Sequence, residues 1–155
     1  MTCLLRYSHN GGQTWRVLAL DLTQSEYFVD LDFLPGGKAC VFQVVASAGI
    51  RTTTAQTEPF SVPCKARVAD ILMPPSDACR DVRMPLLLQG FGFSPDFPEF
   101  GPDEMVWRSN IVGLLGIGRE VVVPALPMGH HLISLSMPNG LGGEVTKSIY
   151  IKVQY

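Results

Sequence analysis

Short runs in which apolar residues alternate with polar or small ones dominate the chain. In one run Cys40, Phe42 and Val44 occupy every second position. Leu5 and Tyr7 repeat the pattern near the N-terminus. A period of two places alternate side chains on one face of a β-strand, where they pack against a core. These runs therefore predict strands with one buried face.

Runs of this kind recur along the whole chain. The predicted strands are 2–8, 14–20, 27–31, 40–47, 58–62, 68–73, 84–90, 105–109, 120–126, 130–137 and 147–155. Between them, 15 glycines and 12 prolines interrupt the sequence too often for helices of ordinary length. The pattern predicts an all-β fold with two β-sandwich modules in tandem and no substantial helix.

The alternation breaks between Pro63 and Arg67, where a proline is followed by polar residues and a new set of strands begins. Breaks of this composition are typical of domain boundaries. We predict a first module over residues 1–63 and a second over residues 64–155.

Composition and charge narrow the classes of function. Of the 155 residues, 46% are hydrophobic and 17% are charged, which is enough apolar material for a packed core. The net charge of -2 and the scattered Lys and Arg residues provide no basic field for nucleic acid. No apolar run approaches the ~20 residues that span a bilayer, and the N-terminus lacks the pattern of a signal peptide. We expect neither nucleic-acid binding nor membrane insertion.

Four cysteines, Cys3, Cys40, Cys64 and Cys79, fit no CxxC pattern and no zinc-ligand spacing. Cys3 and Cys40 lie within apolar alternations, where a thiol behaves as a small buried hydrophobe. Cys64 and Cys79 both fall in loop-like sequence, so this is the one pair in which a disulfide is an alternative to free thiols.

The stretch YSHNGGQTW, residues 7–15, matches the Asp-box of sialidase propellers at Ser8, Asn10, Gly12, Thr14 and Trp15, with Asn in place of Asp. A propeller needs several copies at blade spacing, and the chain contains one. Gly11 and Gly12 supply the positive φ that a hairpin turn requires. We interpret the stretch as a structural hairpin in which the returning strand starts at Thr14.

With its surroundings, this stretch resembles part of a fibronectin type III-like domain of bacterial surface proteins. The family pattern continues with LPGG, residues 34–37, and with an alternating strand that ends in ASAG, residues 46–49. The resemblance implies that the first two strands of the sandwich are lacking. It also places Cys40 where the family often carries the aromatic residue of its tyrosine corner. Apolar strand faces that carry Leu5, Tyr7, Phe42 and Val44 are then expected to meet water.

The remainder resembles an immunoglobulin-like, PKD-type module. The resemblance rests on Trp107 and Ser109, on GLLGIG at residues 113–118 between two strands, and on the run 126–143. It implies that Trp107 is the core anchor and that His131 packs close to it. Many relatives carry an acidic loop where this chain has residues 138–140, which argues against calcium there.

Candidate sites for chemistry are few. His130 and His131 point to opposite faces of a strand, so they do not share a metal ion, and we expect His130 in solvent. The acidic loop that carries Asp96, Glu99, Asp103 and Glu104 offers weak calcium ligands without an EF-hand spacing. No catalytic motif and no cofactor-binding motif is present. We therefore expect no enzyme and no cofactor.

Aromatic residues provide the candidate ligand contacts. Phe93, Phe97 and Phe100 flank the acidic loop, and they either cover the core or form an exposed platform. Trp15 is the other candidate for stacking on a ligand.

The predicted function is a non-catalytic structural or interaction module, a spacer or binding arm, from a larger extracellular or cell-surface protein. The alternative is a carbohydrate-binding module that uses the exposed aromatics, and the third possibility is a fragment of a hydrolase. The partner is a protein or a glycan. Because the first sandwich is incomplete, we expect two copies to pair their apolar faces as a homodimer.

Overall fold

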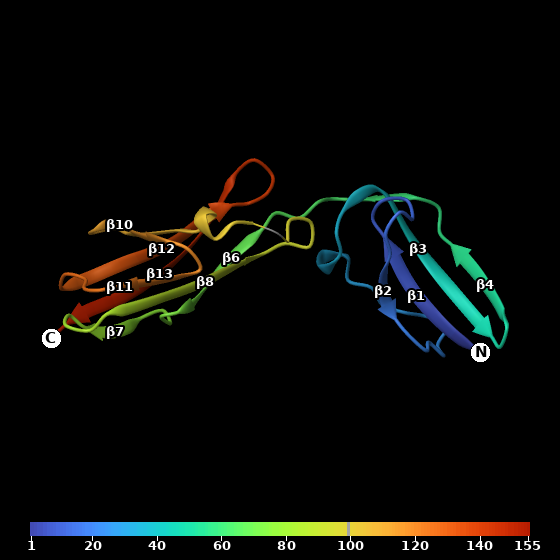
Figure 1. Ribbon diagram of the computed structural model, residues 1–155, viewed down its shortest axis with the longest axis horizontal. Coiled ribbons are helices and arrows are strands. Elements are labelled where there is room, and N and C mark those ends of the chain that lie inside the picture. The colour runs from blue at the N-terminus through green and yellow to red at the C-terminus, as the bar shows by residue number, and fades with distance from the viewer. Residues whose placement is uncertain (99) are drawn as a thin grey trace. The chain divides into compact units, whose positions relative to one another are not determined.

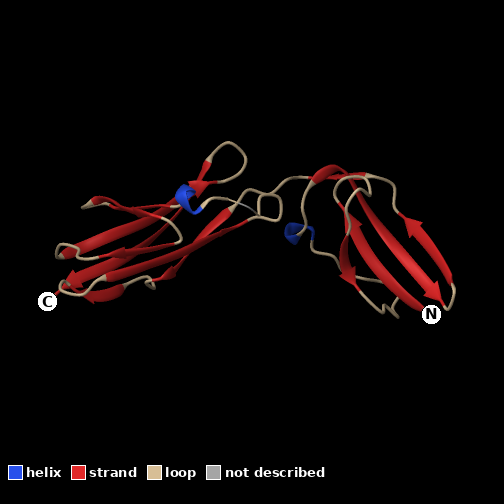
Figure 2. Cartoon of the chain, in the orientation of Figure 1, coloured by secondary structure: helices blue, strands red, loops and turns tan. Residues whose placement is uncertain are grey.

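The computed structural model describes residues 1–98 and 100–155 (Figure 1). Strands dominate it, and the helical segments among the described residues are two short 3-10 turns, η1 (Leu31–Phe33) and η2 (Pro102–Glu104) (Figure 2). The predicted all-β fold class is confirmed. The chain divides into two compact units, Met1–Lys65 and Ala66–Tyr155.

The first unit is built on one open sheet. Its strands are β1 (Thr2–Ser8), β2 (Arg16–Ala19), β3 (Gly37–Ala48), β4 (Arg51–Gln56) and β5 (Phe60–Val62). They follow the order β2-β1-β3-β4, and β5 pairs with the other end of β3. The neighbouring pairs β1–β2, β1–β3, β3–β4 and β3–β5 are antiparallel.

The core of the first unit is small and lies at one end of the sheet. Its buried members are Tyr7, Leu34, Cys40 and Val62. The Tyr7 hydroxyl donates a hydrogen bond of 2.7 Å to the carbonyl of Pro35, which ties the connection before β3 down onto β1. The ring of Phe42 lies 5.2 Å from that of Tyr7, centroid to centroid.

The expectation that the whole apolar face of this sheet meets water is wrong for part of it. Leu5 and Tyr7 are buried, and Phe42 is half-buried. Val44, farther along the face, remains 39% exposed. Residues 22–29 lie over this face but leave a hollow above Val44, so that Val44 stays partly exposed.

The second unit is a two-sheet sandwich. Its strands are β6 (Val68–Met73), β7 (Ala78–Asp81), β8 (Leu86–Phe93), β9 (Val106–Ser109), β10 (Gly113–Ile117), β11 (Glu120–Val123), β12 (Gly129–Pro138) and β13 (Glu144–Gln154). One sheet has the order β10-β9-β12-β13-β7 and the other the order β11-β8-β6. In the larger sheet β7 pairs with β13 in parallel.

A single core lies between these two sheets. The larger sheet contributes Trp107, Ile133 and Leu135, and the smaller contributes Leu86 and Leu88. The two layers approach closely at Gly90 on β8, where a Cβ atom would come within 2.4 Å of Leu135 and 3.0 Å of Trp107. Glycine is needed at this position because a side chain would push the sheets apart.

Several predicted elements differ from the observed ones. In place of the strand predicted over residues 27–31, residues 27–30 form a loop and Leu31 begins η1. GLLGIG is itself largely strand β10, and β4 and β7 were not predicted. The polar strand β4 lacks an apolar alternation because all six of its residues are exposed.

The turn after β1 is longer than a tight hairpin, because β2 begins at Arg16 and not at Thr14. The Ser8 hydroxyl accepts from the Gly12 amide at 2.8 Å, and the Asn10 carboxamide accepts from the Thr14 amide at 2.9 Å. Gly11 and Gly12 have φ angles of 70° and 91°, the left-handed region that favours glycine. Side-chain hydrogen bonds therefore stabilise the motif that resembles an Asp-box.

The cysteines divide by environment. Cys40 is buried and Cys3 is half-buried, whereas Cys64 and Cys79 are exposed. Cys64 belongs to the first unit and Cys79 to the second, and the disulfide between them stays an alternative.

Candidate functional site

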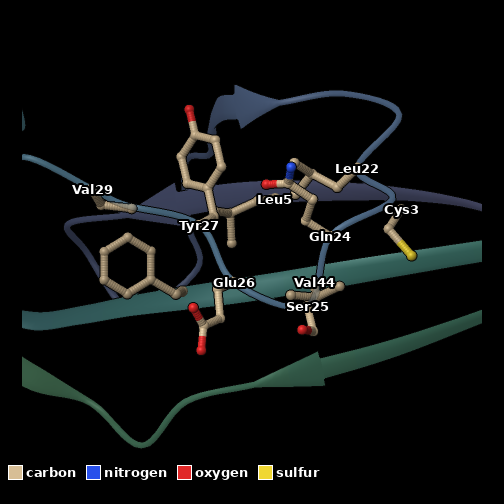
Figure 3. A pocket seen from close by; sticks show the side chains of 10 residues that line it. Cys3, Leu5, Leu22, Gln24, Ser25, Glu26, Tyr27, Val29 and Val44 are labelled. Carbon is tan, nitrogen blue, oxygen red and sulfur yellow. The ribbon is translucent and has the colours of Figure 1, made fainter.

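The principal candidate site is an apolar groove on the open sheet of the first unit. Cys3 and Leu5 of β1, together with Phe42 and Val44 of β3, form its floor. These side chains share a face because Leu5 pairs with Val44 in the antiparallel register. Residues 22–29 contribute the remaining lining side chains, and the cavity has a volume of about 510 Å³ (Figure 3).

The segment that forms the wall of the groove exposes much of its own apolar surface. Tyr27 is 48% exposed, and Phe28 has no protection from solvent. Leu31 and Phe33, which follow in η1, are exposed as well. Only Val29 and Leu34 of this stretch pack against the core. Soluble domains rarely expose so many large apolar side chains together unless they bind something there.

The charged residues in and around the wall segment are all acidic. Between Arg16 and Lys38 the chain contains Asp21, Glu26, Asp30 and Asp32 and no basic residue. Glu26 is one of the residues that line the groove. The groove therefore combines an apolar floor with one carboxylate, that of Glu26, among its lining residues.

The open sheet also presents an edge. Strand β4 pairs only with β3, and its six residues are exposed. An unpaired strand edge offers backbone amides and carbonyls to an incoming strand. The groove and this edge belong to the same sheet, so a polypeptide that docks on one is able to approach the other.

Trp15, a candidate for ligand stacking, is half-buried. The guanidinium group of Arg6 lies 4.4 Å from the centroid of its ring. One face of the indole is thereby covered within the protein. His9, in the same turn, is half-buried.

The three candidate phenylalanines lie in different environments. Phe93 is 49% exposed at the end of β8. Phe97 is half-buried, and Phe100 packs against the core of the second unit. The guanidinium groups of Arg67 and Arg119 lie 4.3 and 5.4 Å from the centroid of the Phe100 ring. The structure does not bring these rings together as one exposed platform.

Phe93 instead belongs to an apolar surface that sequence reasoning missed. Leu87, Phe91 and Phe93 lie on the same face of β8, and all three are exposed. Val122 of β11 pairs with Leu87, and Val68 of β6 pairs with Phe93, and both valines are also exposed. The alternation of β8 signalled a buried face on one side, but the residues on the other side are equally apolar and gave no signal of their own.

The acidic loop shows no assembled cation site. Across residues 1–98 and 100–155, no group of three or more His, Cys, Asp or Glu side chains is arranged to hold a metal ion. The Glu104 carboxylate accepts a hydrogen bond from the Gly101 amide at 2.8 Å, as part of the turn at η2. Asp103 and Asp96 lie in the described part of this loop, whereas Glu99 lies outside the described residues.

His131 is fully buried on β12 and both ring nitrogens are engaged. Nδ1 lies 2.8 Å from the Ser109 hydroxyl, and Nε2 lies 2.8 Å from the Pro127 carbonyl. Because a carbonyl oxygen only accepts, Nε2 carries the proton and Nδ1 accepts from Ser109. Through these two bonds His131 connects β9 to the loop before β12. The neighbouring residue His130 is exposed.

Trp107 is the largest fully buried side chain. Its indole Nε1 donates a hydrogen bond of 2.8 Å to the Gly118 carbonyl. Trp107 on β9 pairs with Leu135 on β12. Ser109, which is hydrogen-bonded to His131, lies two residues farther along β9.

The ion pair between Asp81 and Arg83, on the surface of the second unit, makes stability depend on pH. The Arg83 side chain, 2.9 Å away, and the Arg83 amide hydrogen-bond the Asp81 carboxylate and lower its pKa from the usual 3.8 to about 2. Because the folded pKa is the lower one, this interaction stabilises the fold above pH 3.8 and is lost as the pH falls through about 2.

We predict that Arg83→Gln raises the pKa of Asp81 back toward 3.8, since it removes the charged donor. A carboxyl NMR titration of wild type and variant measures this directly. Asp103→Asn, on another exposed loop, is the control and is expected to leave the Asp81 titration unchanged.

Comparisons with known proteins give no family. No protein-family model matches the chain, and no curated protein matches it. Among solved structures, a chimeric titin Z1Z2-Z1Z2 tandem is similar at 14% identity, with a TM-score of 0.39 over 99% of this chain and 85% of that one. The DIP-gamma IG1+IG2 structure is similar at 13% identity and a TM-score of 0.38, over 99% and 84% of the two chains. These likenesses are too distant to assign a family or a partner.

The described residues contain no helix that is long and apolar enough to span a membrane.

Proposed function

We propose that this chain is a non-catalytic protein-interaction module and that the apolar groove of its first unit binds a polypeptide. The observation that carries the proposal is the open sheet face, where Val44 of the groove floor remains 39% exposed. At ~25 cal/mol per Å², covering a few hundred Å² of such a face contributes several kcal/mol to binding. A ligand that lies on a sheet face in this way acts as the missing layer of a sandwich.

The setting that we propose is an extracellular or cell-surface protein, with the chain serving as a binding arm. The resemblance of residues 1–63 to fibronectin type III-like domains and of residues 64–155 to immunoglobulin-like, PKD-type modules supports it. Tandem β-sandwiches of both kinds are used there to hold binding surfaces at a distance.

Val44→Asp tests the proposal. A panel of extended peptides of mixed sequence is screened against the full chain, and the binders are measured again with the variant. We expect binding to weaken about tenfold or more, because a charge on the groove floor must be desolvated when a ligand covers it. Since Val44 is partly exposed in the free chain, the variant is expected to keep its fold, which circular dichroism checks.

The matched control is Val122→Asp, which changes an exposed valine of the second unit in the same way. It is expected to leave peptide binding intact. A panel in which no peptide binds, or in which both variants lose binding equally, contradicts the proposed function.

Self-association is one form that this function takes if the ligand is a second copy. The sequence predicts a homodimer through the open sheet, and that remains a prediction. Sedimentation equilibrium at tens of micromolar decides it, since a monomer with an intact first unit rules the dimer out.

Glycan binding is a second candidate function, favoured by the exposed pair Phe91 and Phe93. Residues two apart on a strand are separated by ~7 Å, so the two rings stand side by side on one face. Saturable binding on a glycan array that is lost in Phe93→Ala supports it. Binding that survives both Phe91→Ala and Phe93→Ala contradicts it.

A further inference from the structure

We infer that the sheet of the first unit has a second binding surface, on the face opposite the groove, and that this surface binds an acidic polysaccharide built of uronic acid sugars. Arg6 is adjacent to Leu5 of the groove floor on β1, and Gln43 is adjacent to Val44 on β3. Neighbouring residues of a strand point to opposite faces of the sheet. Arg6 and Gln43 therefore lie on the face away from the groove, and the inference does not rest on the proposed function.

A row of polar side chains crosses this face. Arg6 of β1 pairs with Gln43 of β3, which pairs in turn with Gln56 of β4. Arg6 Nε donates a hydrogen bond of 2.7 Å to Gln43 Oε1, and Gln43 Nε2 donates one of 3.1 Å to Gln56 Oε1. These three residues, which we call the donor row, are thus linked side chain to side chain across three neighbouring strands (Figure 1).

The direction of these two hydrogen bonds decides what the donor row offers to a ligand. The carboxamide oxygens of Gln43 and Gln56 both accept within the row. The groups that remain are N–H donors, namely the Nη atoms of Arg6, the second amide hydrogen of Gln43 and the amide group of Gln56. A ligand that is rich in acceptor oxygens matches a row of this kind.

The guanidinium group of Arg6 is held in a position that suits an oxyanion. Its Cζ lies 4.4 Å from the centroid of the Trp15 ring, and its Nε is bound to Gln43. The indole in turn packs closely on its own turn, where a Cβ at Gly12 would come within 3.2 Å of it. The edge formed by the two Nη atoms is a planar fork that matches a carboxylate. Because the side chain is already fixed, binding there costs little rotamer entropy.

No carboxylate of the protein neutralises Arg6. The ion pairs that join described residues lie in the second unit and do not involve it. Asp21 borders the same sheet face, but it lines a separate hollow with Thr2 and Ser47, farther along the strands. A bound carboxylate therefore gains attraction without displacing an internal anion.

The donor row fits a sugar acid better than it fits an acidic peptide. The carboxylate of a Glu or Asp side chain supplies acceptors for Arg6 but leaves the amide donors of Gln43 and Gln56 to other groups. In a uronic acid chain, ring and hydroxyl oxygens adjoin each carboxylate. Neighbouring strands lie ~4.8 Å apart, so the row offers donors at close and regular intervals that a chain of such oxygens is able to meet.

A second copy of the chain does not match this surface. Docking the same face of two copies places donors against donors and Arg6 near its counterpart. Unpaired donors and like charges across an interface both weaken association. The donor row thus selects an anionic, oxygen-rich ligand over self-association.

Isothermal titration calorimetry of the full chain with an oligomer of galacturonic acid tests the inference. We expect saturable binding that weakens about tenfold or more for the fully methyl-esterified oligomer, because esterification removes the charge that Arg6 recognises. Arg6→Gln is expected to weaken binding of the acidic oligomer to a similar extent, roughly tenfold or more. Gln56→Ala, which removes one neutral donor, is expected to weaken it about threefold.

The matched control is Gln89→Ala. Gln89 is a half-buried glutamine of β8 in the second unit, and like Gln43 it donates to a side chain of the neighbouring strand, Glu120 at 2.5 Å. The control is expected to leave the affinity for the oligomer unchanged. Circular dichroism checks the fold of Arg6→Gln. If that variant unfolds the first unit, Gln56→Ala still decides the outcome, since Gln56 is exposed.

Four results would overturn the inference. The galacturonic acid oligomer does not bind, or the acidic and esterified oligomers bind equally, so that charge plays no part. A polyglutamate peptide binds as tightly as the oligomer, which makes an acidic peptide the ligand. Gln89→Ala loses binding while Arg6→Gln keeps it, which moves the sugar to the second unit. Val44→Asp judges peptide binding in the groove on the opposite face, so the proposed function and this inference fail independently.

Discussion

Trp107→Ala is expected to unfold the second unit. The indole is fully buried between the two sheets, and truncating such a residue typically costs ~3–5 kcal/mol. A small domain has a total stability of ~5–15 kcal/mol, so the loss is a large fraction of it. The loss also leaves the Gly118 carbonyl without the indole donor that lies 2.8 Å away in the wild type.

Thermal unfolding followed by near-ultraviolet circular dichroism measures this effect. Trp15→Ala is the matched control, because that indole is half-buried in the first unit. We expect Trp15→Ala to leave the transition of the second unit in place. A Trp107→Ala protein with an unchanged melting temperature would show that the indole is not the core anchor.

His131→Ala is expected to destabilise the second unit by roughly 3 kcal/mol, because it leaves a cavity and removes the partner of one buried and one part-buried polar group. Those groups are the Ser109 hydroxyl and the Pro127 carbonyl, each 2.8 Å from a ring nitrogen. The Ser109 hydroxyl also accepts from the Ile111 amide at 3.2 Å, so the turn after β9 is expected to loosen with it.

Urea denaturation of wild type and variant gives the change in the free energy of unfolding. The adjacent His130 is exposed, and His130→Ala is expected to change stability little. Equal effects of the two substitutions would contradict the structural role of His131.

The fold was largely predictable because most of its strands bury one face. The resemblance to immunoglobulin-like modules implied a core Trp107 with His131 near it, and both side chains are fully buried. Strand β4 could not be predicted, because Arg51–Gln56 is exposed throughout and carries no apolar period. Residues 27–31 looked like a strand because their composition is β-rich, but they pair with no neighbour and instead fold over the sheet.

The candidate site was predictable only in part. The resemblance to fibronectin type III-like domains led us to expect exposed apolar strand faces, and Val44 is exposed whereas Leu5 and Tyr7 are buried. The wall of the groove could not be predicted from the sequence. It depends on how residues 22–29 fold back over β1 and β3, and no local pattern encodes this long-range arrangement. The exposed apolar face of β8 was missed for another reason: Leu87, Phe91 and Phe93 are as apolar as the buried residues between them, so the pattern does not separate the two faces.

The central claim, that the groove of the first unit is the binding surface, is tested most directly by amide hydrogen exchange of the full chain with and without a peptide that binds in the panel. The account predicts that protection increases at residues 22–29 and along the facing parts of β1 and β3 and does not change in residues 66–155. Protection confined to the second unit, for instance along β8, or no change at residues 22–29 when the peptide is bound, would contradict it.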